Sequence, residues 1–290
     1  MKTTIDRRKF LKAAGMGTAG SLVPGHILGT SLAPLYSGLV DPGEEYTLLR
    51  IADLWPDYSF PHVEKFETDQ YKLSFKLYNF YRQFVKDAGA FWIERTGVSD
   101  PVFHVKSERE AAGDVITELN DDYAPYFQGS YLVSGMVHTA GDILATPLSW
   151  SCETKIVRKG EEEAYLNSDH RWTGEFRKGH VYYESGSIKL KKDRIQGELS
   201  WKWGLIHLVQ KMAEQSVREV HFSALDELDM VYEHQYARFR KKQMVDCGRG
   251  PVEFTVIDVL GDGIIPTVYW IDDTNRLVFI VSGVEVYLIN

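Results

Sequence analysis

An alternation of apolar and polar residues that begins at Tyr71 sets the narrowest limits on the fold. Apolar side chains stand at Tyr71, Leu73, Phe75 and Leu77, with lysine or serine between them. Successive side chains of a strand point to opposite faces, so this period of two predicts a strand with one buried face. Residues 147–158 alternate in the same way. The chain is therefore expected to build a sheet.

Short apolar runs bounded by turn residues continue this pattern along most of the chain. Pairs such as Lys159-Gly160 and Lys178-Gly179 separate successive runs, which is typical of an antiparallel meander. The predicted strands comprise residues 71–77, 88–94, 102–107, 113–119, 147–158, 163–176, 180–190, 252–260, 267–272, 276–282 and 284–289. The predicted fold class is mainly β: a curved antiparallel sheet or half-open barrel with one or two short helices.

One segment has helical spacing instead. Leu205, Leu208, Val209 and Met212 fall at i, i+3, i+4 and i+7, which predicts one face of a helix of two to three turns. Ser223, with an aspartate three residues later, predicts the cap of a second short helical turn.

The domain organisation follows from proline content and from the N-terminus. Residues 34–66 hold four of the ten prolines, which predicts an irregular arm. Residues 67–290 are expected to form a single antiparallel β domain. Residues 1–33 are expected to form a separate leader.

The leader contains Arg7 and Arg8, followed by the apolar pair Phe10 and Leu11 and then Lys12. This arrangement resembles a twin-arginine (Tat) export signal. It implies a protein that is periplasmic or secreted, with no transmembrane span in the mature chain. A retained membrane anchor and an ordinary basic N-terminus are the alternatives.

Charge and cysteine content exclude several classes of partner and cofactor. Without residues 1–33 the chain carries 28 basic and 40 acidic residues, a formal net charge of −12. A protein with this net negative charge is not expected to bind nucleic acid. Two cysteines, Cys152 and Cys247, are too few for an iron–sulfur cluster or a four-thiolate zinc site, and no nucleotide-binding glycine motif is present. We therefore expect no cofactor and no metal. The two cysteines either form a disulfide or remain buried thiols.

A series of short motifs runs through the β region: Tyr-x-Leu-x-Phe at 71–75, Ala-Gly-Ala-Phe at 88–91, Phe-His-Val at 103–105, Ala-Ala-Gly at 111–113, Asp-Asp-Tyr at 121–123, and Val-Tyr-Trp-Ile-Asp-Asp-Thr-Asn-Arg-Leu at 268–277. In this order they resemble a widespread exported bacterial domain of unknown function. The sheet of that domain is similar to the sheet of LolA/LolB-type lipoprotein carriers. The resemblance implies a curved antiparallel sheet around a helix over roughly residues 66–290, and it supplies no catalytic residues.

No catalytic motif stands out in the sequence. A nucleophile elbow is unsupported, because Glu184-Ser185-Gly186-Ser187 lacks the leading glycine. His170 and His180 flank a predicted hairpin and are cross-strand neighbours in some registers. The pair Asp272-Asp273 suits either a cation or, more commonly, a turn. We therefore predict no catalytic residues.

Tryptophans are dense in the second half of the chain, where aromatic rings serve either a core or a binding groove. The candidate ligand-binding residues are Trp201, Trp203, His207 and Trp270. Two hypotheses follow. The first is a non-catalytic envelope protein that binds an apolar or amphipathic ligand or a partner protein. The alternative is a secreted carbohydrate-active enzyme, a hydrolase or lyase, on a β-sandwich.

Overall fold

The computed structural model describes residues 61, 63–80, 85–111, 129–158, 169–191, 194–195, 197–226, 228, 230–246 and 251–290. The chain divides into two compact units, Met1–Asp53 and Leu54–Asn290, and every described residue belongs to the second. The predicted leader, most of the predicted arm and the predicted strand at 113–119 lie outside the described residues. The proposed domain boundaries therefore stay predictions.

One open sheet contains all fifteen described strands, in the order β8-β7-β6-β5-β4-β3-β2-β1-β15-β14-β13-β12-β11-β10-β9. In chain order the strands are β1 Tyr71–Phe80, β2 Val85–Thr96, β3 Val102–Ala111, β4 Gly129–Thr139, β5 Pro147–Arg158, β6 His170–Arg177, β7 His180–Ser185, β8 Ile188–Lys191, β9 Leu199–Trp201, β10 Glu219–Asp226, β11 Met230–Asp246, β12 Pro251–Gly261, β13 Thr267–Ile271, β14 Leu277–Ser282 and β15 Glu285–Ile289. The predicted fold class, mainly β with an antiparallel sheet, is confirmed.

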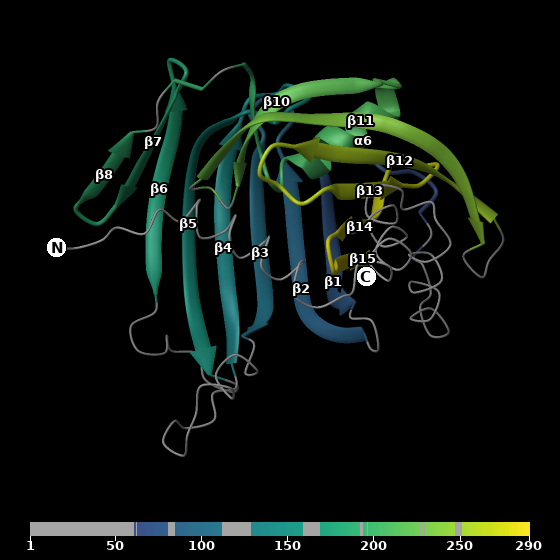
Figure 1. Ribbon diagram of the computed structural model, residues 1–290, viewed down its shortest axis with the longest axis horizontal. Helices are drawn as coiled ribbons and strands as arrows, with labels where there is room; N and C mark the ends of the chain where they lie inside the picture. The colour runs from purple at the N-terminus through teal and green to yellow at the C-terminus, as the bar shows by residue number, and fades with distance from the viewer. Residues whose placement is uncertain are drawn as a thin grey trace, which may run out of the picture. The chain divides into compact units, whose positions relative to one another are not determined.

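The topology is a long meander in which the first and last strands of the chain also pair with each other. Neighbouring strands pair antiparallel, except that the short β9 runs parallel to β10. The last strand, β15, pairs with the first, β1, so that Leu77 lies opposite Tyr287. In Figure 1 the strands β1 to β8 stand side by side, and β10 to β13 run across their direction, with α6 between β11 and β12 in this view. The sheet therefore curves around the helix.

The apolar positions of the alternating segments face α6. Register pairs Phe75 with Phe91 and Ile93 with Val105, so these side chains share one face of β1 to β3. All four are buried. The period of two predicted at Tyr71 is confirmed.

The helix α6, Leu205–Gln215, lies where the apolar spacing predicted it. Its buried side covers β13 and β14. It ends at Ser216, which adopts the left-handed conformation. The second predicted helical turn is wrong: Ser223 and Asp226 belong to β10, in which Ser223 pairs with Leu199 of β9 and Asp226 with Met230 of β11. Sheet pairing overrides the local capping signal there.

A polar cluster fastens α6 to the segment that precedes β1. The Lys211 ammonium lies 2.9 Å from an Asp69 carboxylate oxygen and 2.8 Å from a Glu214 carboxylate oxygen. The Thr68 hydroxyl donates a hydrogen bond of 3.0 Å to the same Glu214 oxygen. Arg95 donates to the Asp69 carbonyl oxygen. The helix is thus held at its C-terminal half by charge-assisted hydrogen bonds.

Asp272 forms a turn and not an exposed cation ligand. It is 4% exposed, and its Oδ1 accepts hydrogen bonds from the Thr274 N–H, the Thr274 hydroxyl and the Arg276 N–H. Its Oδ2 accepts from the Arg276 guanidinium at 3.0 and 3.1 Å. That guanidinium also donates to the Pro61 carbonyl at 2.6 Å. Asp272-Asp273 was compatible with a cation site or with a turn, and the structure shows a turn.

Candidate functional site

A cavity of about 460 Å³ opens on the concave side of the sheet, next to the junction of β9 and α6. Its described apolar lining comes from the turn before α6 and the start of the helix, from strands β10, β12, β13 and β14, and from the turn between β12 and β13: Trp203, Leu205, Ala224, Val259, Ile264, Ile265, Tyr269 and Ile280. Its polar lining includes Arg109, Lys202, Asp226, Tyr232, Gln235, Thr267, Ser282, Glu285 and Tyr287. The volume is within the range of ordinary small-molecule sites, and the lining combines apolar side chains with a similar number of polar ones.

Strand register builds the apolar wall of this cavity. Tyr269 on β13 lies opposite Ile280 on β14, which in turn lies opposite Tyr287 on β15. Residues directly opposite in an antiparallel pair point to the same face. Three adjacent strands therefore place these side chains in one row toward the cavity.

Trp203 connects the cavity to the core. Its ring stacks on Phe91 with centroids 4.0 Å apart, and its centroid lies 5.9 Å from that of Tyr287. The side chain is half-buried, whereas Phe91 is buried. The Lys202 ammonium lies 5.4 Å from the Trp203 centroid, within range of a cation–π interaction. Trp203 thus has a fixed orientation while part of its surface remains accessible.

Two ion pairs flank this aromatic surface. Arg109 contacts Glu285 at 3.0 and 3.4 Å and donates to the Tyr287 hydroxyl at 2.7 Å. The Tyr287 hydroxyl donates to Glu285 at 3.0 Å, which completes a closed ring of hydrogen bonds. On the helix side, Lys202 lies 3.1 Å from Asp226. The cavity therefore combines an apolar wall with paired charges.

Both tyrosines of the cavity wall remain protonated at neutral pH. Burial raises the pKa of Tyr287 well above its ordinary value. Burial, reinforced by the Asp226 carboxylate, raises the pKa of Tyr269 as well. Because a buried phenol resists ionisation, neither group is set up as a base at neutral pH.

Only one of the four residues predicted to bind ligand, Trp203, lines this cavity. Trp201 is fully buried, with its ring edge-on to Phe103 at 5.4 Å. Trp270 is also fully buried and stacks on Phe279 at 4.8 Å. It neighbours Tyr269 along β13 and therefore points to the opposite face of the sheet. These two tryptophans belong to the core and do not line the cavity.

His207 is likewise an interior residue, 2% exposed and 6.1 Å from the Phe103 ring. Burial, together with the positive charges of Arg95 and Lys211, lowers its pKa to about 3. The imidazole is therefore neutral at physiological pH, and it does not line the cavity.

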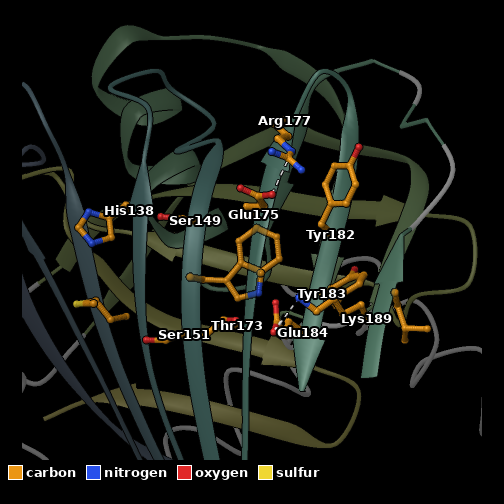
Figure 2. A pocket seen from close by; sticks show the side chains of 14 residues that line it. His138, Ser149, Ser151, Thr173, Glu175, Arg177, Tyr182, Tyr183, Glu184 and Lys189 are labelled. Carbon is orange, nitrogen blue, oxygen red and sulfur yellow. Dashed lines mark ion pairs between the residues drawn. The ribbon is translucent and has the colours of Figure 1, made fainter. Parts of the chain in front are cut away.

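A second hollow, of about 670 Å³, lies on strands β4 to β8 (Figure 2). Register places Ser149, Glu175 and Tyr182 side by side on one face. Figure 2 shows the ion pairs of this hollow, Arg177 with Glu175 at 3.1 Å and Lys189 with Glu184 at 3.2 Å. Each carboxylate is thus paired with an exposed cation, as on an ordinary solvated sheet face.

The described residues around this hollow include a buried tryptophan and two separated histidines. Trp150 lines it but is 3% exposed, and its indole N–H donates to the Leu228 carbonyl at 3.1 Å. Its ring lies across Gly174, where any Cβ would collide with the indole. His170 and His180 are not cross-strand neighbours, because register pairs His180 with Arg177. Among the described residues no group of three His, Cys, Asp or Glu side chains could hold a metal ion.

Cys152 is buried on β5, and Cys247 lies outside the described residues. The two alternatives, a disulfide and two buried thiols, therefore both stay predictions. In the part of the chain that the structure describes, no helix has the length and apolar character needed to cross a bilayer.

Comparisons with known proteins bear on the fold. No protein-family model matches the chain, and no curated protein matches it. Among solved structures it is similar to the crystal structure of a beta-barrel-like protein of a domain of unknown function, DUF1849, from Brucella abortus. The identity is 11% and the TM-score 0.50, over 78% of this chain and 97% of the other. This likeness shows a shared fold and supports the coarser expectation of an uncharacterised β-rich domain.

Proposed function

We propose that this protein is a non-catalytic envelope protein that holds an apolar or amphipathic ligand in the cavity beside Trp203. One observation carries the proposal: a cavity of about 460 Å³ with an apolar wall remains open beside a half-buried tryptophan of fixed orientation. A fully packed sheet–helix interface would leave few voids larger than a water molecule. The resemblance to LolA/LolB-type lipoprotein carriers is in keeping with an apolar ligand.

Replacing Trp203 by alanine is expected to raise the dissociation constant of a neutral hydrophobic dye, N-phenyl-1-naphthylamine, at least tenfold. Aromatic anchors at the centre of a binding site commonly contribute about 2 kcal/mol or more. Fluorescence titration of the purified protein measures the constant. A second variant, Ala224→Phe, fills the same cavity without removing a contact and is expected to weaken dye binding too.

The matched control is Trp92→Ala. Trp92 neighbours Phe91 on β2 and therefore points to the opposite face, where the Lys106 ammonium lies 5.5 Å from its ring centroid. It is also half-buried, so its loss mimics the change in size and hydrophobicity. Equal dye affinity of the wild type, Trp203→Ala and Ala224→Phe would refute the proposal. If the wild type bound no dye but bound or cleaved an oligosaccharide, the carbohydrate-active alternative would replace it.

Export through the Tat pathway is a second, independent part of the proposal. Replacing both Arg7 and Arg8 by lysine is expected to leave the precursor in the cytoplasm, because the arginine pair is the defining part of such a signal. Cell fractionation of a tagged full-length chain measures the distribution. An unchanged periplasmic yield of the double variant would contradict Tat export and leave the cavity proposal untouched.

A further inference from the structure

The size and charge of the cavity beside Trp203 narrow the class of ligand that it can hold. We infer that the ligand is a single-chain amphipath whose headgroup carries no net charge. This inference rests on the proposed function and adds to it a limit on chain number and on headgroup charge.

The volume sets the limit on chain number. A water molecule occupies about 30 Å³ in the liquid, so a cavity of 460 Å³ holds about 15 groups of that size. A methylene group is of similar size, and one acyl chain with a small part of its headgroup therefore fills the available space. A lipid with two such chains would need about twice the volume. Its second chain would remain in water, which loses the favourable transfer of apolar surface.

The apolar part of the ligand has a defined place. Tyr269, Ile280 and Leu205 line the cavity together with the ring of Trp203. These side chains come from β13, β14 and α6, which contact one another. A chain laid along this wall would contact apolar surface on several sides, as ligand sites of this class require.

The paired charges set the limit on the headgroup. The described lining residues carry two positive charges, on Arg109 and Lys202, and two negative charges, on Asp226 and Glu285. Each cation is within 3.1 Å of a carboxylate, so the charges neutralise one another inside the cavity. An ion that enters must either remain uncompensated or separate an existing pair. Both are costly where the groups are partly desolvated.

A headgroup without net charge avoids this cost. The side-chain exposures of the four charged residues are between 28% and 32%, so their outer atoms can still meet a ligand at the edge of the cavity. A hydroxyl, an amide or a zwitterion adds hydrogen bonds there while both ion pairs persist.

The test compares headgroups on one chain. Palmitoyl lysophosphatidylcholine is zwitterionic, palmitoyl lysophosphatidylglycerol is anionic, and hexadecyltrimethylammonium is cationic. Each lipid is added, below its own micellar concentration, to the wild-type protein loaded with N-phenyl-1-naphthylamine. The fall in dye fluorescence gives the dissociation constant of the lipid. We expect the zwitterion to bind at least tenfold more tightly than either ion. Dipalmitoyl phosphatidylcholine is expected to compete at least tenfold more weakly than its single-chain counterpart.

Two variants make the net charge of the cavity lining more positive. Glu285→Gln and Asp226→Asn each remove one negative charge and keep the side-chain shape, so the lining becomes net positive. In both we expect the affinity ratio of anionic to zwitterionic lipid to rise at least tenfold. The control, Glu94→Gln, makes the same change on the opposite face of β2, where Glu94 lies 3.9 Å from Lys72, and is expected to leave the ratio unchanged.

The outcomes separate the inference from the proposed function. Equal affinity for the three headgroups, an unchanged ratio in both cavity variants, or equal binding of the two-chain lipid would overturn the inference while dye binding at Trp203 stands. Failure of the wild type to bind the dye and every lipid would overturn the proposed function itself.

Discussion

Replacing Asp272 by alanine is expected to destabilise the protein by about 3–5 kcal/mol, the usual result of removing one partner from a buried ion pair. Asp272 and Arg276 are 4% and 3% exposed. The carboxylate accepts five hydrogen bonds within this turn, two of them from the Arg276 guanidinium. Without it, the guanidinium stays buried beside the Pro61 carbonyl and loses the carboxylate that pairs with it.

Urea denaturation measures this loss, and thermal unfolding should show it as a fall in Tm of about 10 °C, given 2–4 °C per kcal/mol for a domain of this size. The control is Asp273→Ala, one residue further along the same turn and exposed. A surface change of this kind is expected to stay within about 0.5 kcal/mol. Equal stability of the two variants would show that the buried pair does not hold the turn.

Replacing His207 by glutamine is expected to flatten the dependence of stability on acid pH. The pKa of His207 is about 3 in the folded protein, against 6.5 for an unperturbed histidine. Between these values the unfolded chain binds a proton that the folded chain does not. Stability contributed by the neutral imidazole is therefore complete above pH 6.5 and is lost as pH falls toward 3.

The slope approaches about 1.4 kcal/mol per pH unit for one proton, so between pH 6 and pH 4 the wild type should lose roughly 2 kcal/mol more than His207→Gln. Urea denaturation of both proteins at pH 7, 6, 5 and 4 measures the difference. The absolute stability of the variant does not enter, because only the slopes are compared. Parallel curves would contradict a buried neutral imidazole at this position.

Local sequence patterns predicted the elements that depend on short-range order. The alternation at Tyr71 predicted β1, the run at 147–158 coincides with β5, and the spacing from Leu205 to Met212 predicted α6. In each of these elements one face is buried against the concave interior, and the spacing of apolar residues in the sequence follows from that burial. The local signal failed at Ser223, because β10 pairs with both β9 and β11 and this pairing outweighs a capping motif.

The cavity could not be predicted in the same way. Tyr269 and Trp270 are both buried, one on each face of β13, so the sequence there shows a continuous apolar run without alternation. Such a run does not reveal which face is concave. Arg109 on β3 and Glu285 on β15 are far apart in the sequence. They meet only because β15 pairs with β1, which lies two strands from β3 in the sheet. Of the four residues first considered for ligand binding, the aromatic density therefore located Trp203 but could not separate it from core tryptophans.

Native mass spectrometry of the protein, purified gently from the envelope of cells that export it, tests the central claim most directly. The account predicts a folded protein that carries one additional small mass, released by organic solvent as a single-chain amphipath. Trp203→Ala prepared in the same way should lose most of that mass, while Trp92→Ala should retain it. A wild-type protein that carries no ligand and takes up none from added single-chain lipid would contradict the account.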